Sequence, residues 1–152
     1  MKTLKFLTLT LVAAFFASYS NGQTVEQTST KLTEHHTTIK TKSEELQNGT
    51  AKDQKTSAEE MSKHVEGAKK QHAMLKKKLT PEQITTTKEH HATIEKHHKI
   101  ITTSTESIKQ ETMKPKPDAA AIKGHAKKIN ESVAVAESEN VEIKKKTVVA
   151  SK

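Results

Sequence analysis

Residues 80–113 read TPEQITTTKEHHATIEKHHKIITTSTESIKQETM, and this stretch decides the fold class. Its apolar and medium-sized residues recur at alternating intervals of three and four. They form one seam that consists of Ile84, Thr87, His91, Ile94, His98, Ile101, Thr105 and Ile108. Positions with this spacing lie on one face of an α-helix, and a sustained seven-residue repeat is typical of helices that pack side by side at a shallow angle. The stretch therefore predicts a long helix with one buried face.

The ends of this stretch carry helix start and stop signals. Thr80 precedes Pro81, which suits the first helical position, and Gln83 stands three residues after Thr80 as in a capping box. The sequence MKPKP at 113–117 then ends the helix, because proline cannot continue it. These signals predict a helix over 81–113.

Three further segments have the same spacing. Their seams are Val25, Ser29, Leu32, His36, Ile39, Ser43 and Leu46; Ala58, Met61, Val65, Ala68, His72, Leu75 and Leu79; and Ile122, Ala126, Ile129, Val133, Ala136, Asn140 and Ile143. Gly49 provides a C-cap, and Ser57 and Asp118 provide N-caps. We therefore expect helices over 24–48, 57–78, 81–113 and 118–145, followed by a frayed basic tail from Lys144 onward. Short connections make successive helices antiparallel. The predicted fold is an all-α, up-down-up-down four-helix bundle with coiled-coil-like seams.

The first 22 residues have the three parts of a secretory signal peptide. Lys2 and Lys5 form a basic start, residues 6–17 form an apolar run, and small residues follow at the positions that a signal peptidase reads. We predict a signal peptide over 1–22, a bundle over 23–152, and a secreted or periplasmic protein. The apolar run is too short to span a bilayer as a stable helix, so we expect no stable membrane insertion after cleavage.

Composition excludes several classes of site. The chain has no cysteine, which rules out disulfides, iron–sulfur clusters and thiolate metal sites. Its only aromatic residues are Phe6, Phe15, Phe16 and Tyr19, all inside the predicted signal peptide. Gly67 and Gly124 stand within predicted helices, where each costs about 1 kcal/mol relative to alanine. We therefore expect a bundle with a thin core and marginal stability.

The histidines are the chemical signal of the sequence. There are nine, and four of them fall on the seams: His36, His72, His91 and His98. Counting residues along each helix places His72 and His91 on one tier, with His36 within reach. The same count places His64 and His98 on a second tier roughly 10 Å away. Imidazole is the commonest protein ligand for transition metals, so we predict an interhelical metal site among these five histidines, without a choice between Zn, Cu and Ni.

The histidines are also compatible with two roles that involve no metal. They could serve as medium-sized polar filler of the seams, or as groups that titrate near pH 6. Catalytic patterns are weak, because no glycine-flanked serine and no glycine-rich phosphate loop occur. Only Glu95 and His98 have the Glu-x-x-His spacing of a carboxylate-bridged di-iron bundle, which needs it on two helices. We therefore expect a non-enzymatic protein with no cofactor other than a metal ion.

The positive charge suggests a third class of function. The net charge is +8, and all 26 basic residues are lysines, with runs at 76–78, 127–128 and 144–146. Such runs could bind anionic surfaces. Nucleic-acid recognition usually adds arginine and stacking aromatic side chains, so we expect no nucleic-acid partner. The sequence leaves open whether the protein forms a homo-oligomer or binds a protein partner.

Residues 79–83, LTPEQ, resemble the Leu-Thr-x-x-Gln element of small periplasmic helical stress proteins, the Spy/CpxP-like chaperones and metal sensors. The resemblance covers five residues and occurs once, whereas those proteins carry the element twice. It implies a structural or chaperone-like periplasmic interaction protein, in which the histidines would be incidental. A capping box accounts for the same residues equally well.

Overall fold

The computed structural model describes residues 24–148, so the predicted signal peptide over 1–22 lies outside the described residues. The described part is all-α, with four helices joined by short connections and no β-strand between residues 24 and 148. Its helices are α2 (Val25–Asn48), α3 (Gln54–Lys78), α4 (Pro81–Thr112) and α5 (Ala119–Val148). None of these helices is long and apolar enough to cross a membrane.

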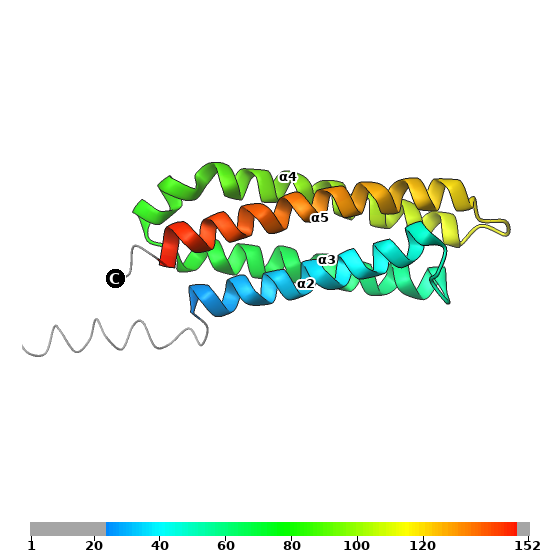
Figure 1. Cartoon of the computed structure of the whole chain (residues 1–152), viewed down its shortest axis with the longest axis horizontal. Coiled ribbons are helices and arrows are strands. Elements are labelled where there is room, and N and C mark those ends of the chain that lie inside the picture. The colour runs from blue at the N-terminus through cyan, green and yellow to red at the C-terminus, as the bar shows by residue number, and fades with distance from the viewer. Residues whose placement is uncertain (1–23, 149–152) are drawn as a thin grey trace, which may run out of the picture.

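The helices form a four-helix bundle, as predicted. Successive helices run in opposite directions along its long axis (Figure 1). Helix α2 packs against α3 and α5, and α4 packs against the same two helices, so that each helix has two neighbours in a closed ring. The interface between α3 and α4 is the smallest of the four.

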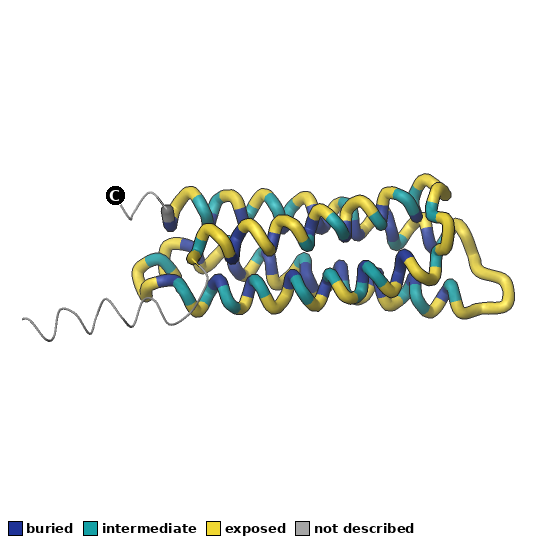
Figure 2. Tube along the Cα trace, turned by 90° about the horizontal axis from the view of Figure 1, so that it is seen from below, coloured by how far each residue is buried: buried dark blue, intermediate teal, exposed yellow. Residues whose placement is uncertain are grey.

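The predicted seams form the core. Figure 2 shows the buried positions along the inner sides of the helices. Every predicted seam residue from Ser29 to Ile143 is buried except Ile84, whose side chain is 39% exposed because it lies in the first turn of α4 at the end of the bundle. Val25 is partly buried and packs against the core. The seven-residue repeat thus identifies the buried face of all four helices.

Most helix ends also agree with the sequence signals. Gly49 ends α2 in the left-handed conformation, with φ 71° and ψ 22°. Thr80 and Gln83 form both hydrogen bonds of the capping box that begins α4. The Asp118 carboxylate accepts hydrogen bonds from the backbone N–H groups of Ala120 and Ala121 at the start of α5.

Two predicted ends are wrong. Helix α3 begins at Gln54, and its N-cap is Asp53, whose carboxylate accepts a hydrogen bond from the Lys55 N–H; Ser57 lies inside the helix and is buried. Helix α5 continues through the basic run in place of the predicted fraying. There the Lys144 ammonium group forms an ion pair with the Glu26 carboxylate of α2 at 3.2 Å, and this ion pair connects the end of α5 to α2.

Polar side chains, some buried and some at the edge of the core, link α2 to α5. Asn140 accepts a hydrogen bond from the Ser29 hydroxyl and donates to the Thr33 hydroxyl, each at 3.1 Å. Ser43 donates to the Asn130 side chain further along the same interface. Because buried hydrogen bonds need matched partners, these contacts fix how α2 and α5 are aligned along their lengths.

Candidate functional site

Four buried histidines lie together inside the bundle. His36 comes from α2, His72 from α3, and His91 and His98 from α4, and their side chains are 0 to 4% exposed. We call these four residues the histidine core. Each occupies a seam position, which is why the helical repeat turns all four inward.

The rings of the histidine core contact one another in a chain. The Nε2 atoms of His36 and His98 are 2.9 Å apart, and His72 Nε2 lies 2.8 Å from His91 Nδ1. The His72 and His98 rings join these two pairs in an edge-to-face contact, with their centroids 5.6 Å apart. The order of contact is therefore His36, His98, His72, His91.

The two tiers expected from the sequence are not separate. His72 and His91 share a level as predicted, but His36 pairs with His98 and not with them. His91 and His98 are seven residues apart on α4, roughly 10 Å along its axis. The His72 ring lies between them and contacts both, because the α3 side chain enters from the opposite side of the interface. The outcome is one continuous cluster across three helices.

Burial keeps this cluster neutral. It lowers the pKa of His36 to about 3, with the neighbouring His98 and His72 as further causes. It also lowers the pKa of His72 to about 3, with His91 and His98 adding to the effect. The pKa values of His91 and His98 fall to about 4, again chiefly through burial and then through Lys76 and Lys69 respectively. All four imidazoles are therefore uncharged at pH 7.

Two ring nitrogens of the cluster are buried without a hydrogen-bond partner: His36 Nδ1 and His91 Nε2. In each histidine pair one nitrogen must donate and the other accept, so the tautomers of the two rings are coupled. Buried polar atoms normally have partners, and an unpartnered one in a native protein needs a physical reason. Neutral imidazole nitrogens of this kind can coordinate a metal ion.

His64, the fifth predicted ligand, lies outside the histidine core. It is half-buried on α3 and faces His35 of α2, with their Nδ1 atoms 3.1 Å apart. The His35 ring lies directly over Gly67, where an added Cβ atom would lie within 2.8 Å of three ring atoms. The sequence shows only that His64 neighbours a seam. The glycine three residues later is the signal that a side chain from another helix needs space there.

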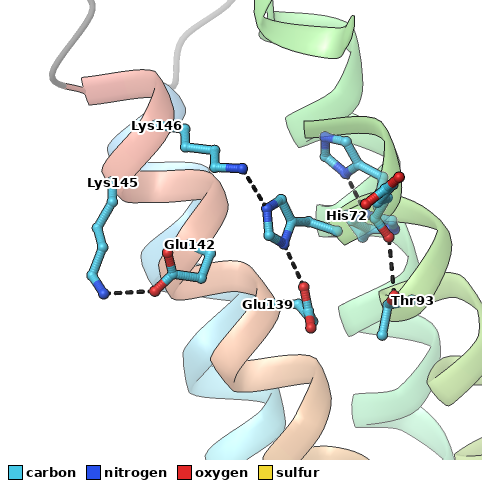
Figure 3. Close-up of polar contacts among 9 residues, drawn as sticks. His72, Thr93, Glu139, Glu142, Lys145 and Lys146 are labelled. Atoms are coloured by element: carbon cyan, nitrogen blue, oxygen red, sulfur yellow. Dashed lines mark hydrogen bonds and ion pairs between the residues drawn. The ribbon is translucent and has the colours of Figure 1, made fainter. Parts of the chain in front are cut away.

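His90 has a structural role between α4 and α5. Its ring contacts Glu139 and Lys146 of α5, both of which are labelled in Figure 3. Lys146 lies 2.8 Å from His90 Nε2, and because an ammonium group can only donate, Nε2 accepts and the proton stands on Nδ1. That Nδ1–H donates to Glu139 at 2.5 Å. Both ring nitrogens are thus engaged, and His90 is not a candidate ligand.

A groove between α3 and α4 reaches the histidine core. Its volume is about 590 Å³, and His72 and His98 are among the residues that line it. No group of three or more His, Asp or Glu side chains within residues 24–148 is already arranged to hold one metal ion. A metal site here would therefore be completed by ring rotation or by water from the groove.

The comparisons with known proteins assign this chain to no family. No family model matches the chain, and no curated protein or solved structure is significantly similar to it. The histidine core, its lowered pKa values and its connection to the groove are the features from which a function can be inferred.

Proposed function

We propose that this is an exported, non-enzymatic helical-bundle protein that binds a transition metal ion, Zn, Cu or Ni, through interhelical histidines. The observation that carries the proposal is the histidine core, in which two pairs of ring nitrogens approach to 2.8 and 2.9 Å deep between three helices. Export is supported by the signal-peptide pattern of residues 1–22.

The spacing of the nitrogen pairs supports metal coordination. Two imidazole nitrogens bound to one tetrahedral zinc ion, each 2.0–2.1 Å from the metal, lie roughly 3.3 Å apart. The pairs in the histidine core are closer than this by about half an ångström, which a small rotation of either ring removes. A third ring is at hand, because His72 contacts both His91 and His98.

The protonation state supports it as well. Metal ions bind the neutral form of imidazole, so a histidine that is charged must first lose a proton. The four pKa values of about 3 to 4 mean that each ring already has one unprotonated nitrogen at pH 7. For both nitrogens of one pair to bind the same ion, the donating ring takes its other tautomer, with the proton on its outer nitrogen. Moreover, a bound ion would link α2, α3 and α4 in a core that has no Phe, Tyr or Trp side chain among the described residues.

Thermal unfolding followed by circular dichroism tests the proposal. The chain from residue 23 onward is freed of metal with a chelator and melted with and without Zn(II), Cu(II) or Ni(II). A ligand that binds only the folded state stabilises it by about 2.7 kcal/mol at a hundredfold excess over Kd. We expect at least one ion to raise Tm by several degrees.

Glutamine substitutions locate the site. The double variant His72→Gln/His91→Gln keeps side-chain size and polarity, and it should abolish most of the metal-dependent shift. The matched control, His97→Gln/His125→Gln, changes two half-buried histidines outside the core and should keep it. Absence of any shift in the unmodified protein would favour a structural or chaperone-like role with incidental histidines. Equal losses in both variants would mean diffuse binding by a histidine-rich surface.

A further inference from the structure

The groove between α3 and α4 has mainly apolar walls. It runs along residues 69–77 of α3 and 95–103 of α4, about two turns or roughly 12 Å of each helix. Ala73, Thr102, Thr103 and four lysines line it, and each of these side chains has an aliphatic part. The neutral rings of His72 and His98 lie at its base, so the groove can hold the hydrocarbon part of a ligand.

The rim of the groove is positively charged. Four lysines line it, with Glu95 as the one carboxylate among the lining residues. Lys76 is neutralised by Glu95 at 2.7 Å, a hydrogen bond that lowers the pKa of Glu95, and Lys69 pairs with Glu66 at 2.9 Å.

Two of these lysines keep an uncompensated charge. Within the described part of the chain, Lys77 and Lys99 have no carboxylate partner. Two ammonium groups thus stand beside an apolar surface, where an anion would meet both charge complementarity and reduced competition from water.

Two more grooves of similar size provide a comparison. The groove between α2 and α5, about 520 Å³, is lined by Lys144 and Glu34 as its charged residues. A second groove beside α3 and α4, about 560 Å³, has two lysines and two glutamates. Charges are balanced in both. Of these three grooves, the one that contains Ala73 is thus lined by an excess of positive charge, whereas the other two are balanced.

We propose that this groove binds a small organic anion with an apolar body, such as a medium-chain alkyl carboxylate. The carboxylate pairs with Lys77 or Lys99, and the hydrocarbon chain lies along Ala73 and the threonine methyl groups. Ligand sites with this division, mostly apolar walls and a few charged groups that fix orientation, are typical of small-molecule binding. The proposal does not depend on metal binding, because its contacts are those of Lys77, Lys99 and the apolar walls, and it uses no ring nitrogen of the histidine core.

Isothermal titration calorimetry with decanoate tests it on chelator-treated protein from residue 23 onward. We expect saturable binding of one decanoate per chain, below the concentration at which decanoate forms micelles. Decyltrimethylammonium, with the same alkyl chain and the opposite charge, should not bind.

Charge reversal locates the site. Lys77→Glu/Lys99→Glu should weaken decanoate binding at least about tenfold. Each substitution removes an ammonium group that can pair with the decanoate carboxylate and introduces a carboxylate that repels it. Lys127→Glu/Lys128→Glu makes the same change in net charge at exposed positions of α5 and should leave Kd within about twofold. All four lysines are exposed, so both variants should keep the wild-type circular dichroism spectrum.

Three results would overturn the proposal: no saturable binding of decanoate, equal binding of the cationic analogue, or equal weakening by the α5 control. The metal experiment has independent outcomes, because it changes His72 and His91 and measures stability with metal present. Ala73→Leu adds a check without any change of charge. Its larger side chain fills part of the groove and should also weaken decanoate binding.

Discussion

Gly67 shows how a single residue shapes the surface of the bundle. Glycine within a helix lowers stability by about 1 kcal/mol relative to alanine, because the unfolded chain has more freedom to lose. At this position the missing side chain leaves room for the His35 ring from α2, three of whose atoms lie within 2.8 Å of where a Cβ would stand. The glycine thus permits the contact between His35 and His64.

Gly67→Ala should separate this histidine pair. Because His35 is a half-buried surface side chain, its ring can swing into solvent and the helix backbone need not move. The pKa of His35 is lowered by burial first and by His64 second, so the variant should raise it towards 6.5. NMR titration of the His35 ring protons measures this change.

Gly124→Ala is the matched control, since nothing lies within 4 Å of a Cβ added there. It should stabilise the protein by up to about 1 kcal/mol in urea unfolding and leave the His35 titration unchanged. Gly67→Ala should gain less, because it also loses the ring contact. An unchanged pKa of His35 in Gly67→Ala would contradict this description of the pair.

At the scale of the helix, the start of α4 has a complete capping box, as the start of α2 has with Thr24 and Gln27. The Thr80 hydroxyl accepts from the Gln83 N–H, and the Gln83 side chain accepts from the Thr80 N–H. The Gln83 amide also donates to the Thr147 carbonyl oxygen at 3.1 Å, which links the start of α4 to the end of α5. Gln83 therefore both closes the capping box of α4 and connects α4 to α5.

Thr80→Ala should lower the free energy of unfolding by about 1 kcal/mol, the usual loss when an N-cap hydroxyl is removed. Urea unfolding followed by circular dichroism measures it. Thr85→Ala is the control: Thr85 is exposed, and its hydroxyl donates to the Pro81 carbonyl oxygen within the same helix. If the two variants lost equal stability, the capping box would not be the source of the effect.

The same scale shows what the sequence can predict. The seams are visible because the seven-residue repeat of a helix is a local property, and their burial follows from it. The start of α3 is harder to place, because Asp53 and Ser57 are both good N-cap residues and only packing chooses between them. Ser57 lies on the side of α3 that faces the core, so the helix extends past it to Asp53.

The candidate site is predictable by residue but not by contact. His36, His72, His91 and His98 follow from their seam positions, and the structure brings all four together. Their pairing depends on how far α3 and α4 are shifted relative to each other along the bundle. Counting residues along each helix predicts this shift only to about half a turn. His64 cannot be separated from them by a count, because a count measures height along the axis, whereas the His64 side chain points towards His35 at the edge of α2 and α3.

For the molecule as a whole, the neutral histidine core predicts sensitivity to acid. The four pKa values of about 3 to 4 are lower than the ordinary 6.5, so the unfolded chain takes up protons below pH 6.5 while the folded chain does not. Stability is therefore complete above about pH 7 and falls as the pH is lowered towards 4. Each histidine contributes about 1.4 kcal/mol per pH unit in that window.

Urea unfolding at pH 7.5, 6.5, 5.5 and 4.5 measures this slope. His72→Gln/His91→Gln removes two of the four groups with the largest pKa shifts and should markedly reduce the slope. His97→Gln/His125→Gln, the matched pair outside the core, should reduce the slope less, although burial lowers the pKa of His97 as well. Equal stability of the unmodified protein at pH 7.5 and 5.5 would mean that the four histidines are accessible to protons in the folded state.

The closed ring of helices has a consequence for chain connectivity. Helix α2 starts and α5 finishes at the same end of the bundle (Figure 1), where Lys144 reaches Glu26. The segment between α4 and α5, residues 113–118, is exposed throughout. A circular permutant that joins the two adjacent ends with a short linker and opens this segment would run α5, α2, α3, α4. It would keep all four interfaces and the histidine core, because the order in which the chain visits the helices is separable from the packing that holds them.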